Sequence, residues 1–176
     1  MRVLDVDGND APVGDPGELL FRGPTMMAAY WNQPEQTAKT LVGEWLHSGD
    51  IGKVDADGNI YVLDRLKDMI VTNGFNVYPK EVESIMCEVP GILSASVVGI
   101  PDGARGERVV AFAIPKQGAA PKESEVIQYC EANLARFKVP WCVLFLDEMP
   151  LTATGKIRRF QLRELALTML KADTKP

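Results

Sequence analysis

The chain has 176 residues, of which 46% are hydrophobic and 24% charged, the balance of a folded globular protein with one ordinary domain or two small ones. A net charge of −5 argues against binding to nucleic acid. No run approaches the ~18 consecutive apolar residues of a membrane helix, and the first residues lead into an acidic turn rather than a secretory apolar segment. We therefore expect a cytoplasmic protein. Peripheral association with a membrane stays open, although no basic amphipathic helix requires it.

Charge is unevenly distributed along the chain. Residues 1–64 hold 11 acidic and 4 basic residues, a net charge of −7, whereas residues 65–176 hold 13 acidic and 15 basic residues, a net charge of +2. Two halves of different charge predict a boundary near residue 65. We expect two small domains, residues 1–64 and 65–176, that meet at a short charged joint.

The first part of the chain predicts a β-rich structure, because short apolar runs alternate with turn residues. Asp57-Gly58 predicts a hairpin, since this turn needs positive φ angles. The stretches at residues 5–9 and 55–59 resemble calcium loops, but the glycine comes too early and no glutamate closes the loop. Strands are expected at residues 2–6, 18–22, 51–54 and 60–63.

After residue 65, strands and helices alternate, which predicts an α+β fold. A helix should begin at Pro79, because apolar residues then recur on one face at Val82, Ile85, Met86 and Val89. A second helix should begin near Pro121 and a closing helix should span residues 160–170. With strands at residues 92–100, 108–114 and 142–146, the expected second domain is a three-stranded sheet with helices plus a hairpin.

Cys87, Cys130 and Cys142 lie far apart without a CxxC pair, and the chain has a single histidine, His47. This pattern does not fit a metal site. We expect three reduced cysteines in the core.

The segment from Thr152 to Lys156 has the composition of a flexible loop that would leave an ammonium group free to reach a phosphate. It is not a Walker loop, because Pro150 stands where that motif needs glycine. Considered alone, the segment is better explained as an exposed lysine in a loop before a helix, and only its context favours a contact with phosphate.

Two further segments are ambiguous when taken singly. Asp50, at the expected start of a strand, would accept two hydrogen bonds from a vicinal diol such as a ribose, or would cap a turn. The charges of residues 64–68 fit either a joint between domains or a solvated turn. Gly74 is expected in a hairpin loop whose backbone only glycine tolerates.

Taken together, these segments resemble the C-terminal signatures of the adenylate-forming superfamily, which includes acyl-CoA synthetases, peptide-synthetase adenylation domains and luciferases. The resemblance covers nearly the whole chain. DRLKDMI followed by GFNVYPKEVE is most similar to bacterial fatty acyl-CoA ligases, with aryl-CoA ligases of the coumarate type next. The other matching segments are GELLFRGP, AYWNQPEQT, EWLHSGDIGKVDADGNIYVL and PLTATGKIRR.

This resemblance implies that residues 1–64 end a large nucleotide-binding domain and that residues 65–176 form a mobile lid. Such enzymes join a carboxylic acid to AMP with ATP, release pyrophosphate, and pass the acyl group to coenzyme A. Negative charge that builds on the phosphoryl oxygens requires a cation, which the resemblance assigns to Lys156. It assigns contacts with the ribose to Asp50 and Arg65.

The resemblance also assigns the second step to the lid in a different orientation. Lys67 would be the hinge, a position where many relatives have aspartate and others lysine. Gly74 and Phe75 would line the passage for the pantetheine arm. The implied cofactors and partners are ATP, Mg²⁺, coenzyme A and a carboxylic acid, without nucleic acid; oligomeric state and acyl chain length stay open.

The family's Ser/Thr/Gly-rich phosphate loop and its glutamate-bearing segment do not occur in these residues, nor does an acyl pocket. We therefore expect Mg²⁺ to be bound mainly by a missing N-terminal part and the fragment alone to be inactive, with Met1 an artificial start. One alternative is an adenylation domain that loads a carrier protein. Another is a stand-alone lid that only binds a partner.

Overall fold

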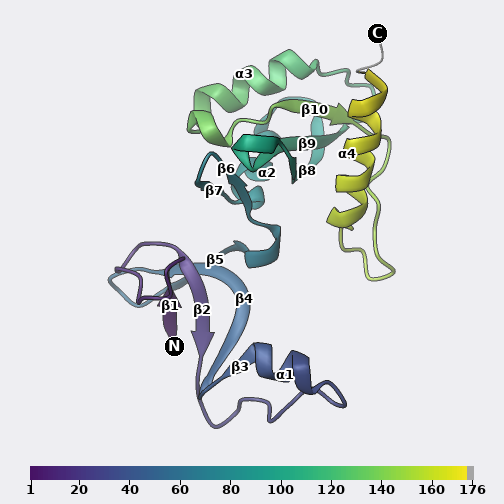
Figure 1. The fold of residues 1–176 in the computed structure, drawn as a ribbon. Helices are drawn as coiled ribbons and strands as arrows, with labels where there is room; N and C mark the ends of the chain where they lie inside the picture. Colours follow the sequence, from purple (N-terminus) through teal and green to yellow (C-terminus); the bar gives the residue numbers. More distant parts are fainter. Residues whose placement is uncertain (174–176) are drawn as a thin grey trace. The chain divides into compact units, whose positions relative to one another are not determined.

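The computed structural model describes residues 1–173, which form two compact units: Met1–Lys67, and a second unit that begins at Asp68. The sequence predicted a change after residue 64. The first unit extends further because its last strand, β5, continues to Arg65 and a single 3₁₀ turn, Leu66–Asp68, connects the units. Helices and mostly antiparallel strands make up an α+β fold, as predicted (Figure 1).

The first unit is a five-stranded antiparallel sheet. Four strands follow the order β1-β2-β4-β3, and β5 also pairs with β4. Leu19, Leu20 and Ile51 are its buried apolar side chains. The strands are β1 Arg2–Leu4, β2 Gly17–Phe21, β3 Leu41–Val42, β4 Trp45–Val54 and β5 Ile60–Arg65.

The hairpin predicted at Asp57-Gly58 joins β4 to β5, and Gly58 has a φ angle of +83°. Asp55 organises this turn. Its Oδ1 accepts hydrogen bonds from the backbone amides of Asp57 and Asn59 at 3.0 and 2.9 Å, and its Oδ2 accepts from the Tyr61 hydroxyl at 2.9 Å. Asn59 Nδ2 also donates to Oδ2 at 3.0 Å, and this bond, followed by that from the Asn59 amide, is the main cause that lowers the pKa of Asp55. Protein donors therefore occupy the oxygens that a calcium loop would offer to a cation.

Helix α1, Pro34–Thr40, was not predicted. It buries no residue, so the sequence carries no apolar stripe that would reveal it. Pro34 suits the first turn of a helix, where a missing N–H costs no hydrogen bond. The hydroxyl of Thr37 accepts a hydrogen bond from the Tyr30 amide at 2.9 Å and so ties the helix to the preceding loop.

The second unit is built on a three-stranded sheet in the order β10-β9-β8. The strands are β8 Ile92–Pro101 and β9 Glu107–Pro115, which are antiparallel, and β10 Cys142–Phe145, which is parallel to β9. Helices α2 Pro79–Glu88 and α3 Glu123–Asn133 cover one face. Helix α4, Arg159–Asp173, covers the other (Figure 1).

Alternating side chains of the central strands build a core on each face. Val97 and Ala111 face α2 and α3, where Val82 and Met86 of the predicted helical stripe are fully buried. On the opposite face, Phe112 packs in a fully buried cluster with residues of α4. Each such side chain contributes about 1.5–3 kcal/mol by leaving water.

A small hairpin precedes α2 and consists of β6 Ile70–Thr72 and β7 Phe75–Val77. Its turn residues, Asn73 and Gly74, have φ angles of +50° and +79°. Two successive positive φ angles are typical of the two-residue turn whose twist matches that of the two strands it joins. Gly74 was expected to lie in such a hairpin turn.

The expectation of three core cysteines was wrong for Cys87, which lies on the exposed side of α2 next to buried Met86. Cys130 is buried and Cys142 is partly buried, and burial raises the pKa of both thiols to about 11. Among residues 1–173, no helix is long and apolar enough to cross a bilayer.

Candidate functional site

Asp50 lies inside strand β4, not at the start of a strand as predicted, because β4 begins at Trp45. Glu18 of β2 pairs with Ile51 and Leu20 pairs with His47, so a single residue of β2 lies opposite residues 48–50. This bulge includes Gly49 at φ +68°. Bulges turn side chains away from the regular alternation of a strand, and this one sets the direction of Asp50.

Glu18 stabilises the bulge from the neighbouring strand. Its Oε1 accepts a hydrogen bond from the Gly49 amide at 3.0 Å, and its Oε2 lies 2.8 Å from His47 Nδ1. Within the bulge, the Asp50 amide donates to the Ser48 hydroxyl at 3.0 Å. The position of Asp50 is therefore set by side-chain contacts as well as by strand pairing.

Asp50 and Arg65 are brought together, as pairing partners of β4 and β5. Arg65 Nε lies 2.7 Å from Asp50 Oδ1, and the two side chains are 56% and 30% exposed. One carboxylate oxygen thus faces the guanidinium group, while Oδ2 accepts no hydrogen bond from the residues that the structure describes. An aspartate held in this way can still accept a hydrogen bond from a hydroxyl group of a ligand.

Lys67, the predicted hinge, is the last residue of the first unit and is exposed within the 3₁₀ turn Leu66–Asp68. A short turn without a buried side chain is suited to absorb a change of backbone angles, because few packing contacts oppose it.

Lys156 ends a tight, hydrogen-bonded turn between β10 and α4. The Thr152 amide donates to the Lys156 carbonyl at 2.7 Å, and the Gly155 amide donates to the Thr152 carbonyl at 2.9 Å. The Lys156 amide donates to the Thr152 hydroxyl at 3.0 Å. Gly155 has φ +77°, the conformation for which glycine is favoured at a bulged turn. Hydroxyl groups that suggested flexibility therefore close the turn instead.

The ammonium group of Lys156 projects from this ordered turn. The residue is exposed, and no carboxylate within residues 1–171 lies within ion-pair distance of it. A cation that is fixed at its base and not neutralised at its tip can reach an anionic ligand without first breaking an ion pair.

Gly74 and Phe75 are anchored on two sides. On one side the Asn73 amide donates to the Arg105 carbonyl at 2.8 Å, within the segment that connects β8 to β9. On the other side the Phe75 ring stacks on Phe137 with centroids 4.6 Å apart. A Cβ atom at Gly74 would meet nothing within 4 Å, so open space lies beside this residue.

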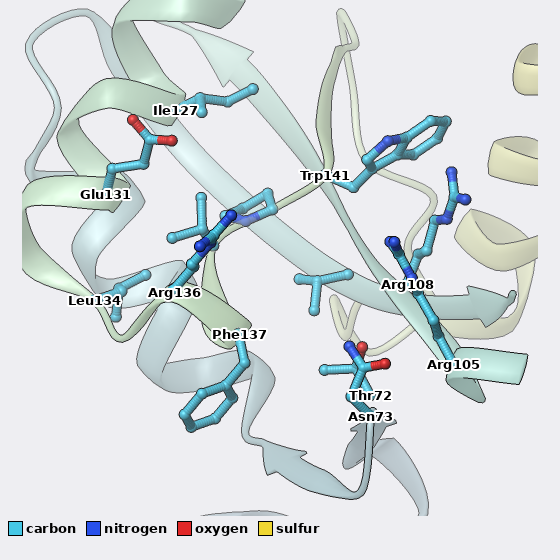
Figure 2. A pocket seen from close by; sticks show the side chains of 13 residues that line it. Thr72, Asn73, Arg105, Arg108, Ile127, Glu131, Leu134, Arg136, Phe137 and Trp141 are labelled. Carbon is cyan, nitrogen blue, oxygen red and sulfur yellow. The ribbon is translucent and has the colours of Figure 1, made fainter.

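A cavity of about 960 Å³ opens beside the same hairpin (Figure 2). Its wall combines side chains of the hairpin, of the β8–β9 connection, of α3 and of the segment that leads to β10. Three guanidinium groups line it, from Arg105, Arg108 and Arg136, together with Glu131 and the indole of Trp141. Cavities that combine cations with an aromatic surface suit ligands that carry phosphate and a flat ring.

Two of these arginines differ in their surroundings. Arg108 pairs with Asp102 at 2.6 Å and lies over the Trp141 ring at 4.4 Å. The hydrogen bond to Asp102 raises the pKa of Arg108 and lowers that of Asp102. Arg136 has no ion pair with the side chains of residues 1–171. Sequence reasoning missed this cluster, because the fold brings together arginines from separate segments, none of which forms a motif.

The structure keeps the predicted residues of the second unit apart. Figure 1 shows the turn before α4 on a different side of this unit from the β6–β7 hairpin. Lys156 and Gly74 therefore belong to two separate surfaces of one unit, whereas Asp50 and Arg65 form a pair in the other.

Comparison with known proteins agrees with these motifs. A family model described as the AMP-binding enzyme C-terminal domain matches residues 81–156. A long-chain-fatty-acid–CoA ligase of Escherichia coli O6:H1 is 41% identical over 165 residues, which cover 94% of this chain and 29% of the ligase. Residues 81–156 belong to the AMP-binding enzyme C-terminal domain family.

Other proteins show a similar degree of identity. An indoleacetate–CoA ligase of Aromatoleum aromaticum is 42% identical over 165 residues, covering 94% of this chain and 32% of that protein. The crystal structure of ATP-bound MatB from Rhodopseudomonas palustris superposes with a TM-score of 0.87 at 37% identity, covering 93% of this chain and 33% of that one. The chain thus spans about 30% of the length of the curated AMP-binding relatives it matches.

Proposed function

We propose that this chain is the C-terminal part of an ATP-dependent acyl-CoA synthetase, with residues 1–67 completing a nucleotide-binding domain and the unit from Asp68 acting as its mobile lid. The observation that carries the proposal is the exposed, unpaired ammonium of Lys156 on a hydrogen-bonded turn. Similarity to a long-chain-fatty-acid–CoA ligase and an indoleacetate–CoA ligase supports a carboxylic acid as the substrate class. A fatty acid is our first choice and an aryl acid the alternative.

In the first step a carboxylate oxygen attacks the α-phosphorus of ATP and pyrophosphate leaves. Negative charge grows on the phosphoryl oxygens and on the leaving group, and a cation aimed there stabilises the transition state more than the ground state. Lys156 supplies this charge. Asp50 accepts hydrogen bonds from the ribose hydroxyls, and Arg65, at 2.7 Å from it, orients the aspartate.

In the second step the thiol of coenzyme A attacks the acyl carbonyl and AMP leaves. The surface around Gly74 serves this step, because the space next to its Cα admits a thin pantetheine arm. Lys156 and Gly74 lie on different surfaces of the second unit, so each step needs this unit in another orientation. Lys67, at the junction of the units, is the hinge.

The arginine-lined cavity favours coenzyme A over a carrier protein as the acyl acceptor. Both present the same pantetheine arm, but only coenzyme A carries a phosphorylated nucleotide. Guanidinium groups bind phosphate through paired hydrogen bonds, and Trp141 offers a flat surface to a base. Asn73 lines this cavity and precedes Gly74, so a nucleotide bound there would direct its arm past the hairpin.

The remaining components are assigned to the part of the enzyme outside this chain. No group of three or more acidic, histidine or cysteine side chains within residues 1–171 converges to hold a metal ion. We assign the Mg²⁺ that accompanies ATP mainly to that other part. We propose that the 176 residues alone do not form acyl-adenylate.

The test is thioester formation by the full-length enzyme with ATP, coenzyme A and a panel of fatty and aryl acids. We expect turnover with at least one class, and none by the isolated 176 residues. Arg136→Gln should raise KM for coenzyme A about tenfold, since a charged hydrogen bond contributes about 1.5–3 kcal/mol, and should leave KM for ATP unchanged. An enzyme that acylates a carrier protein but not coenzyme A would contradict the choice of acceptor.

A further inference from the structure

Arg159, the first residue of α4, lies three residues after Lys156 and is a partly buried charge with partners on several elements of the second unit. Its side chain is only 16% exposed and Glu83 of α2 is 15% exposed. Nη1 donates to Glu83 Oε1 at 2.7 Å and Nη2 donates to Oε2 at 3.1 Å. This is a two-pronged contact, which fixes orientation as well as distance.

The same two side chains also satisfy the open edge of the sheet. Strand β8 pairs only with β9, so its other edge carries main-chain groups without a strand partner. The Val97 amide donates to Glu83 Oε1 at 2.7 Å, and Arg159 Nη1 donates to the Val97 carbonyl at 2.6 Å. The Glu83 carboxylate and the Arg159 guanidinium thus make the two main-chain hydrogen bonds with Val97 that a neighbouring strand would otherwise make.

A third contact reaches the start of the unit. Asp68 Oδ2 lies 3.8 Å from Arg159 Nε, and its side chain is 18% exposed. Asp68 directly follows Lys67, the last residue of the first unit. One guanidinium group therefore touches the joint-side segment, helix α2 and strand β8.

The connection from Arg159 back to Lys156 is short and hydrogen-bonded. The Arg158 amide donates to the Pro150 carbonyl at 2.8 Å, and Leu151 pairs with Ile157 across the turn. The Arg158 carbonyl accepts a hydrogen bond from the Leu162 amide at 3.3 Å, which joins the turn to the first turn of α4. Movement of Arg159 would therefore displace the base of the turn that presents Lys156.

We propose that Arg159 is a positioning residue for Lys156. Held by Glu83 and the Val97 carbonyl, it fixes the turn to the sheet and to the segment after the joint, so that Lys156 and Asp68 move as one rigid body when the lid turns. This inference rests on the proposed role of Lys156 in adenylate formation. Arg159 itself does not touch the reacting atoms.

The activity test uses Arg159→Lys in the full-length enzyme, with Arg158→Lys as the matched control. Lysine keeps the charge but cannot contact both Glu83 oxygens and the Val97 carbonyl. A displacement of about 1 Å at a reacting group costs up to about 100-fold. We expect kcat for acyl-adenylate formation to fall about 10- to 100-fold, with KM for ATP and the rate of thioester formation from supplied acyl-adenylate within about threefold of wild type.

A second readout does not depend on activity. Under native conditions a lysine-specific protease cuts the chain after Lys156 only when the turn opens, and mass spectrometry identifies that cut. In full-length Arg159→Gln we expect cleavage after Lys156 at least about tenfold faster than in wild type, and in Arg158→Gln no faster than about twofold. A global unfolding transition measured for each variant separates local opening from loss of the fold.

The outcomes discriminate between the two proposals. If wild type forms no acyl-adenylate, the proposed function fails, and with it the catalytic part of this inference, while proteolysis still decides the anchoring. If wild type is active but Arg159→Lys lowers both steps equally or neither, the positioning role is wrong. Equal cleavage after Lys156 in Arg159→Gln and Arg158→Gln would overturn the anchoring itself.

Discussion

Replacing Gly74 by alanine separates backbone strain from obstruction of a passage. Gly74 has φ +79° and a Cβ there would meet nothing within 4 Å. The only intramolecular cost is the left-handed conformation, roughly 1–2 kcal/mol for a residue with a side chain. For a unit of this size we expect the melting temperature to fall by about 4–8 °C.

Gly118 offers a matched control, because it has φ +77° and equally free space, in the loop between β9 and α3. Gly74→Ala and Gly118→Ala should therefore have the same stability within about 0.5 kcal/mol, the error of such a comparison. Urea unfolding of both full-length variants measures this. Stability alone then cannot explain a difference in activity between them.

In thioester formation from supplied acyl-adenylate and coenzyme A, we expect Gly74→Ala to be at least about tenfold slower than Gly118→Ala, a loss of about 1.4 kcal/mol in the barrier. Adenylate formation should stay within about threefold in both variants. Equal thioester rates for the two variants would refute the reasoning that Gly74 lines a passage. A parallel loss of both steps in Gly74→Ala would point to damage of the fold.

Three further predictions concern other parts of the chain. Asp50→Asn should raise KM for ATP at least about tenfold, because it removes a charged hydrogen-bond acceptor for the ribose. The melting temperature should not change, because the exposed ion pair that is weakened contributes only about 0–1 kcal/mol. An unchanged KM would contradict a ribose contact. Phe112→Ala should destabilise the second unit by about 3–5 kcal/mol in urea unfolding, and a loss below about 1 kcal/mol would contradict its full burial. At pH 8 iodoacetamide should alkylate the exposed Cys87 first. Burial raises the pKa of the Cys130 and Cys142 thiols to about 11, so both stay protonated and unreactive at this pH. Simultaneous labelling of all three cysteines would be inconsistent with the structure.

The sequence predicted those elements whose residues face a core or require an unusual backbone. The stripe that includes Val82 and Met86 identified α2 because apolar spacing reports which side of a helix is buried. The turns at Gly58 and Gly74 were predictable because their positive φ angles exclude most other residues. The α+β class followed from the order of these elements.

Other features depend on contacts between distant residues and left no local signal. Helix α1 has no buried face, and β4 continues through the Ser48-Gly49 bulge only because Glu18 of a neighbouring strand stabilises it. The arginine cavity and the contacts of Arg159 join segments that are up to 76 residues apart. Asp50 and Arg65 were chosen by resemblance, and their pairing across β4 and β5 became apparent only in the structure.

The central claim is that Lys156 supplies the cation for adenylate formation. The most direct measurement compares full-length wild type, Lys156→Ala and the control Lys116→Ala, another exposed lysine of the second unit, in both half-reactions. We predict that Lys156→Ala lowers acyl-adenylate formation by about 10²–10³-fold while thioester formation from supplied acyl-adenylate stays within about threefold, and that Lys116→Ala changes neither. Adenylate formation at the wild-type rate in Lys156→Ala would contradict the account.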